Sequence, residues 1–91
     1  MKNEIINQLK EFEEGYNELF VGDTWADIEI SDAYKYGFGV FCHIQEMEDS
    51  VGIYEVAVYR NYIDENGSLT SDWTRTVVPI FCINKDFEEV L

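Results

Sequence analysis

The histidine and the two cysteines are the side chains whose chemistry is easiest to recognise. His43 directly follows Cys42, and Cys82 lies in a second apolar run. Thiolates and imidazole could bind zinc, and a Cys82–His43 pair could act as nucleophile and base. Adjacent strand residues, however, point to opposite faces, and free cysteines are commonly buried. We therefore interpret both cysteines as small core side chains; a zinc site, a catalytic pair and a disulfide are the alternatives.

Two other segments contain the residue types of a calcium-binding loop and of a phosphate-binding loop, but not the spacing or context that either loop needs. Four carboxylates occur close together: Asp23, Asp27, Glu29 and Asp32. They lack the spacing and the glycine of an EF-hand calcium loop. Gly37-Phe38-Gly39 lies inside a predicted strand and is not followed by a helix, unlike a phosphate-binding loop. The sequence thus predicts no cofactor and no metal, and we expect a protein that is not an enzyme.

Negative charge is the strongest signal in the composition. The 91 residues include 19 Asp and Glu against six Lys and Arg, for a formal net charge of −13. Such a chain repels nucleic acid and anionic membranes. Aromatic residues on a sheet could stack on bases, but base-stacking surfaces need a positive groove. No run of about 18 apolar residues occurs, and the first residues do not resemble a signal peptide, so we expect a cytoplasmic protein.

An amphipathic helix is predicted over residues 2–20. Its apolar positions recur at the i, i+3, i+4 spacing: Ile5, Ile6, Leu9, Phe12, Tyr16, Leu19 and Phe20. Four glutamates fall on the opposite side: Glu4, Glu11, Glu14 and Glu18. Steps of three or four helical residues cover about 4.5 to 6 Å, so these glutamates form a line of negative charge. Phe12 and Tyr16 are expected to pack on the core.

Period-two patterns then predict a sheet. Residues 24–30 alternate, with Trp25 on the side opposite Ala26 and Ile28. Residues 34–45 form the organising strand, whose buried row is Tyr34, Tyr36, Phe38, Val40, Cys42 and Ile44. Its other face carries Gly37 and Gly39, which mark a bend, a bulge or a close approach. After an acidic loop at 46–50, residues 52–63 are apolar on both faces and predict an interior strand.

The last third of the chain predicts a hairpin and a helical turn. Asn66-Gly67 favours a type I′ turn, which would place Arg60 opposite Trp73. Pro79 marks an edge, a bulge or a break in the return strand 69–83. Asn84 is a candidate N-cap for a helical turn over 85–91. We therefore expect one α+β domain over residues 1–91, with the N-terminal helix packed on a four-stranded antiparallel sheet.

These features favour a small acidic protein that binds and inhibits a basic, nucleic-acid-binding partner such as a nuclease. A line of carboxylates could meet a groove built to receive phosphates. In size, charge and build the chain has the profile of phage and mobile-element anti-defence inhibitors, such as anti-CRISPR proteins and DNA mimics, although it matches no motif of theirs. The candidate partner-binding residues are Glu4, Glu11, Glu14, Glu18, Glu46, Glu48, Asp49, Asp64, Glu65, Trp25 and Trp73.

The alternative is a cytosolic immunity or antitoxin-type protein that neutralises one basic toxin enzyme. That function needs a compact hot spot, for which Trp25, Trp73 and Tyr62 ringed by carboxylates are the candidates. Both hypotheses predict a basic protein surface as partner and no direct contact with nucleic acid or membrane. The oligomeric state stays open, and a second copy could cover the face at Gly37 and Gly39.

Overall fold

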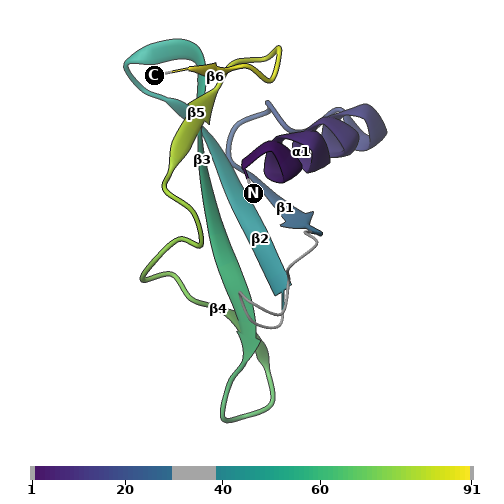
Figure 1. Cartoon of the computed structure of the whole chain (residues 1–91), viewed down its shortest axis with the longest axis vertical. Coiled ribbons are helices and arrows are strands. Elements are labelled where there is room, and N and C mark those ends of the chain that lie inside the picture. The colour runs from purple at the N-terminus through teal and green to yellow at the C-terminus, as the bar shows by residue number, and fades with distance from the viewer. Residues whose placement is uncertain (1, 30–38, 91) are drawn as a thin grey trace.

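The computed structural model of the chain describes residues 2–29 and 39–90, and it has one helix on one side of an antiparallel sheet (Figure 1). The sheet order is β1-β2-β3-β5-β6, and β4 pairs with β3. The predicted α+β class is confirmed. The predicted four strands are wrong, since the sheet has six, because the return strand divides in two and the last residues form a further strand.

Helix α1 spans Lys2–Tyr16 and ends four residues before the predicted boundary. Asn17 adopts a left-handed conformation (φ 55°), which ends a helix and turns the chain. Leu19 therefore enters the core from a turn, where it is fully buried. Tyr16 is left at the helix end, 67% exposed, so the prediction that it packs on the core is wrong. Phe12 does pack against the core, as predicted.

The three longest strands form an antiparallel meander. They are β1 (Thr24–Ile28), β2 (Gly39–Met47) and β3 (Ser50–Ile63). Strand β3 lies between β2 and β5, which confirms the predicted interior strand. Between β2 and β3 only Glu48 and Asp49 lie outside the strands, so the acidic loop is shorter than expected.

The face of the sheet beneath α1 carries the core. Val40, Cys42 and Ile44 are buried there, as the period-two row predicted, together with Val56 and Val58 of β3. The first three members of that row, Tyr34, Tyr36 and Phe38, lie outside the described residues. Phe41 is also buried, on the opposite face, which the alternating pattern did not predict. Part of the second face is therefore covered as well.

The hairpin between β3 and β4 (Leu69–Ser71) does not have the predicted turn. Ile63 pairs with Leu69, and the loop is closed by hydrogen bonds between Asp64 and Ser68. Gly67 has a positive φ (79°), whereas Asn66 does not, so the loop has three central residues instead of two. The register shifts by one residue, and the predicted Arg60–Trp73 pair is wrong: the Asp72 N–H donates to the Arg60 carbonyl (3.1 Å).

The return strand is interrupted between β4 and β5 (Phe81–Ile83), as Pro79 predicted. The N–H groups of Asp72 and Val77 donate to the carbonyls of Arg60 and Val58, respectively. The two acceptors are two residues apart, whereas the donors are five apart. Residues 73–76 therefore loop out of the sheet, and this loop carries Trp73.

The C-terminal residues form a hairpin, so the predicted helical turn over 85–91 is wrong. Strand β6 (Glu89–Val90) pairs with β5. The Asn84 side-chain oxygen accepts the N–H groups of Asp86 and Glu88, and therefore caps a tight turn instead of a helix. Phe87 occupies the left-handed position (φ 62°) that Gly67 takes in the other hairpin. An ion pair between Lys2 and Glu89 (2.6 Å) joins α1 to β6.

Across the part of the chain that is described, no helix is long and apolar enough to span a membrane.

Candidate protein-binding face

Five rings from distant parts of the chain meet on the side of the sheet that faces away from α1. This aromatic cluster consists of Trp25, Phe41, His43, Tyr59 and Trp73. The Trp25 ring stacks on His43 (centroids 4.4 Å apart, 25° between planes) and on Phe41 (5.1 Å, 30°). Trp73 meets Trp25 edge-on at 4.9 Å. Such arrangements are favourable for aromatic quadrupoles, so the rings hold one another in place.

Strand register explains why four of these rings come together. Trp25 lies opposite His43 in the β1–β2 pair, and Phe41 lies opposite Tyr59 in the β2–β3 pair. Side chains of directly paired residues share a face and lie about 4.5 to 5.5 Å apart at Cβ. The fifth ring, Trp73, comes from the 73–76 loop and covers Phe41 from the side (5.8 Å). Phe41 is buried because its neighbours in the cluster surround it.

Asp72 holds the base of that loop. Its carboxylate accepts hydrogen bonds from the hydroxyl and the backbone N–H of Thr74. Arg60 and Arg75 place their Nε atoms 3.5 and 3.8 Å from the second oxygen. The hydrogen bonds from Thr74, and then the two guanidinium groups, lower the pKa of Asp72 from its ordinary value of 3.8. The loop that positions Trp73 is therefore fixed by a charged network.

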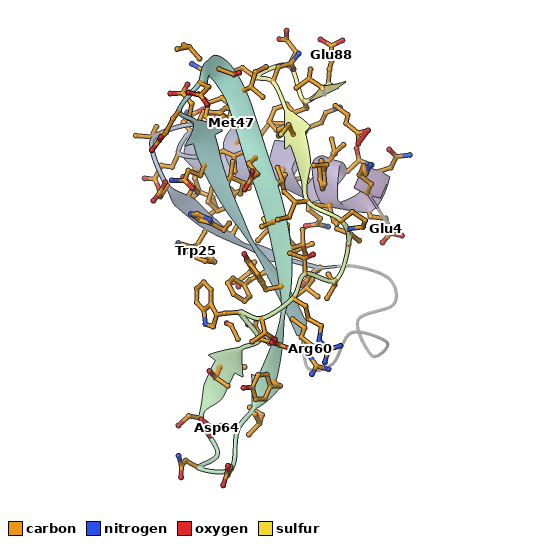
Figure 2. The ribbon with its side chains drawn as sticks, turned by 90° about the vertical axis from the view of Figure 1, so that its left-hand side faces the viewer. Glu4, Trp25, Met47, Arg60, Asp64 and Glu88 are labelled. Carbon is orange, nitrogen blue, oxygen red and sulfur yellow. The ribbon has the colours of Figure 1, made fainter. Side chains whose placement is uncertain are left out.

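Exposed apolar side chains occur both in the cluster and farther along the same face. Trp25 and Trp73 are 44% and 61% exposed, although Trp25 is stacked and Trp73 makes edge contacts. Farther along the same face, Ile63 pairs directly with Leu69, and both are about half exposed. We call the aromatic cluster together with Ile63 and Leu69 the open face, which Figure 2 shows from the side opposite α1, with Trp25 labelled. The hydrogen-bonded pair Asn61–Ser71 lies between the cluster and Ile63 on this face, so the exposed apolar side chains form two neighbouring groups. Exposed apolar groups of this kind mark interaction sites.

Carboxylates border the open face. Asp27 is exposed and lies opposite Phe41 in the β1–β2 pair. Asp23 places a carboxylate oxygen 4.0 Å from Nε2 of His43. Glu55 lies on the same side of the sheet, two positions along β3 from Ala57, the partner of His43. The apolar surface is thus bordered by negative charge.

The predicted site residues do not form one surface. Glu4, Glu11 and Glu14 are exposed on α1, whereas Glu18 lies beyond the end of the helix. Among the predicted residues, the structure brings the rings of Trp25 and Trp73 into contact, and Glu18 lines a hollow beside Trp25. The remaining predicted carboxylates lie at opposite ends of the molecule's long axis: Glu46, Glu48 and Asp49 at the β2–β3 turn, and Asp64 and Glu65 at the β3–β4 turn (Figures 1 and 2).

Two of those carboxylates have a structural role in turns. A side-chain oxygen of Asp64 accepts the N–H groups of Asn66 and Ser68, at 2.9 and 3.0 Å. The Glu46 carboxylate accepts the N–H of Gly52 (3.1 Å). Burial, with the Glu46 charge as a smaller cause, raises the pKa of the neighbouring Tyr54. These hydrogen bonds give Asp64 and Glu46 a structural role that does not require binding to a partner protein.

The cysteines lie on different faces and are both free thiols. Cys42 is in the core beneath α1, where burial raises its pKa to about 12. Cys82 pairs with Glu55 and therefore lies on the other side of the sheet; burial, then the Glu55 charge, raises its pKa also. Both thiols stay protonated near neutral pH, which disfavours nucleophilic attack.

Among the described residues, no group of three or more His, Cys, Asp or Glu is arranged to hold a metal ion.

Three members of the aromatic cluster were not among the predicted site residues: Phe41, His43 and Tyr59. A signal for them exists in the sequence, because each lies on the strand face opposite the buried row. Their meeting with Trp73 depends on the loop at 73–76, which no local pattern predicts.

Comparison of the chain with protein-family models, with curated proteins and with solved structures finds no match.

Proposed function

We propose that the chain is a non-enzymatic, cytoplasmic interaction protein that binds a basic partner protein through the open face and thereby inhibits it. The aromatic cluster is the observation that carries this proposal. Two tryptophans from segments far apart in the sequence meet edge-on within the cluster, yet each leaves about half of its surface exposed. Binding hot spots are enriched in tryptophan and tyrosine and are surrounded by contacts that exclude water.

The net charge of −13 supports a basic partner. Complementary charge steers association and suppresses wrong partners, while buried aromatic anchors supply most of the affinity. Enzymes that act on nucleic acids present basic grooves, so an immunity-type contact with such an enzyme suits both the charge and the cluster. The carboxylates of Asp23 and Asp27 beside the rings favour this hypothesis over a contact made by charge alone.

A second candidate function is mimicry of DNA by an anti-defence inhibitor. Exposed Glu11 and Glu14 on α1 favour it. The positions of the other predicted carboxylates do not favour mimicry, because those of the β2–β3 turn and those of the β3–β4 turn lie at opposite ends of the molecule (Figure 1). A DNA-binding groove could contact both turns and α1 only if it surrounded the chain.

The test begins with a partner captured from the native host and then purified. Trp73→Ala should weaken its binding by about 2 kcal/mol or more, because a hot-spot ring is removed. Tyr16→Ala is the matched control, since Tyr16 is an equally exposed aromatic residue away from the open face. The double reversal of Glu11 and Glu14 to Lys should mainly slow association.

A different order of effects would contradict the proposal. If Trp73→Ala binds like the parent while the double reversal abolishes binding, the helix is the contact surface and mimicry is favoured. Competition with duplex DNA gives an independent measurement, because DNA displaces a mimic from a nucleic-acid groove but leaves a contact elsewhere on the partner intact.

A further inference from the structure

A hollow of about 360 Å³ lies beside Trp25, at one end of the open face. It is lined by Phe12, Glu18, Val21, Asp23, Thr24 and Trp25. Sites for small ligands in proteins range from about 300 to 1,000 Å³, so this one suits a single long side chain or a small molecule. Its wall combines two aromatic residues with two carboxylates and contains no basic residue.

The turn after α1 fixes the wall of this hollow. Leu19 is fully buried, and its N–H donates to a carboxylate oxygen of Glu13 (3.0 Å). The Thr24 hydroxyl donates to the carbonyl of Glu18 (3.0 Å), which ties the turn to the start of β1. The backbone of Glu18 is therefore anchored on both sides. The backbone that carries the wall is in place before any ligand binds, which lowers the entropic cost of binding.

The Trp25 ring is held in position by contacts with other rings. It stacks on His43 and Phe41, yet 44% of the residue stays exposed. The Asp23 side chain is 61% exposed, and one of its carboxylate oxygens lies 4.0 Å from Nε2 of His43. Within the described residues no ion pair involves the Glu18 carboxylate. Two carboxylates thus lie beside a stacked indole, and among the described residues neither is paired with a lysine or an arginine.

We infer that this hollow binds the arginine side chain of a protein partner. A guanidinium group is planar, stacks on aromatic rings and pairs with carboxylates through two parallel hydrogen bonds. A lysine ammonium can also pair with a carboxylate and attract an indole, but it neither stacks as a plane nor forms two parallel hydrogen bonds with a carboxylate. The inference rests on the proposed function, since the arginine would belong to the basic protein that the open face contacts, but the site can be tested without that protein.

The probe is N-acetyl-L-arginine amide, titrated into the ¹⁵N-labelled chain and followed by NMR. Saturable shifts of the Trp25 indole N–H and the Thr24 amide are expected, with much smaller shifts at Trp73. The uncharged analogue N-acetyl-L-citrulline amide has nearly the same shape and should not bind. The double variant Glu18→Gln, Asp23→Gln should weaken arginine binding by about tenfold or more, because hydrogen bonds to charged groups are lost.

The control variant, Glu11→Gln with Glu14→Gln, removes the same charge from helix residues that do not line the hollow. Its affinity for the probe should stay within about twofold of the parent, since distant exposed charges are screened. Equal weakening in both double variants would overturn the inference, because the probe would then respond to net charge. Equal binding of citrulline amide, or of N-acetyl-L-lysine amide, would overturn the guanidinium site as well.

The outcomes separate this inference from the proposed function. If arginine amide does not bind but Trp73→Ala still abolishes partner binding, only the arginine site is wrong. If arginine amide saturates the hollow while Trp73→Ala leaves partner binding unchanged, the open-face function is wrong and the arginine site remains.

Discussion

Beneath α1, strands β2 and β3 bury Cys42, Ile44 and Val56 completely, whereas the other side of the same strands carries His43 and Tyr59 in a stack of rings. The first face is covered by a helix and filled mainly with aliphatic side chains, together with Tyr54 and Phe81. Within residues 2–29 and 39–90, the second is covered by its own aromatic side chains and by the 73–76 loop. Alternating strand residues therefore build two different structures from one sheet.

The difference separates stability from recognition. Aliphatic side chains of the covered face gain free energy by leaving water, in proportion to the area buried. The rings of the open face are held by one another and keep part of their surface for a further contact. Substitutions on the first face should change folding most, whereas substitutions on the second should change binding most.

The largest effect is expected for Ile44→Ala. Ile44 is fully buried beneath α1, and truncation of such a residue costs about 2 to 5 kcal/mol through lost transfer free energy and a cavity. Urea denaturation followed by circular dichroism measures the free energy of unfolding. Ile63→Ala is the control, because Ile63 is half exposed on the open face and should change stability by about 0.5 kcal/mol or less. If both variants lose the same unfolding free energy, the covered face does not contribute more to stability than the open face.

Trp73→Ala should have an intermediate effect on folding. It removes edge contacts to Trp25 and Phe41, and aromatic pairs contribute about 0.5 to 1.5 kcal/mol beyond area burial. We expect a loss of about 1 to 2 kcal/mol in the same denaturation experiment, with increased solvent exposure of Trp25 by fluorescence. A loss as large as that of Ile44→Ala would identify the open face as a second core.

Asp72→Asn should destabilise the chain less, and in a pH-dependent way. The pKa of Asp72 in the folded chain is below its ordinary 3.8, so the unfolded state binds more protons between the two values. The stabilisation by the Asp72 carboxylate is complete above about pH 3.8 and is lost as the pH falls through the folded pKa. The difference in unfolding free energy between parent and variant should therefore shrink in that acidic range. A difference independent of pH would show that the charge is unimportant.

The smallest effect is expected for chemical labelling of the two cysteines, which requires no substitution. It compares how accessible a thiol is on each face of the sheet. Iodoacetamide at mild alkaline pH should alkylate partly exposed Cys82 before fully buried Cys42, whose pKa is about 12. Mass spectrometry of timed samples resolves the two sites. In denaturant both should react at similar rates, and faster reaction of Cys42 in the folded chain would contradict its position beneath α1.

Local patterns predicted the two faces of β1 and β2, because side-chain alternation is a property of every strand. They did not predict the turns. Asp64 and Asn84 each accept hydrogen bonds from N–H groups two and four residues later. A helix N-cap begins with a similar contact. The sequence at Asn84 therefore fits a helix start and a hairpin equally well, and only pairing with β5 decides between them.

The candidate site shows the same limit. The tryptophans could be named from the sequence as hot-spot candidates, but their contact could not be predicted. It requires the three-residue turn that ends at Gly67 and a loop over residues 73–76. Hydrogen bonds between Asp64 and Ser68 close the turn, and hydrogen bonds from Asp72 and Val77 to β3 hold the loop. The helical pattern correctly predicts that Glu4, Glu11 and Glu14 are exposed on α1. It wrongly includes Glu18 in the helix, because the left-handed backbone at Asn17 ends the helix before that residue.

Phe87 links the C-terminal hairpin to the order in which the chain folds. A left-handed backbone is unfavourable for phenylalanine, so this turn has little tendency to form alone. Its ring packs on Phe20, which in turn packs on Tyr54 (centroids 5.3 and 4.6 Å apart). The turn thus becomes favourable only after the segment that follows α1 has docked against β3. We therefore expect β5 and β6 to acquire protection from hydrogen exchange later than the β3–β4 hairpin, which has Gly67 at the equivalent position.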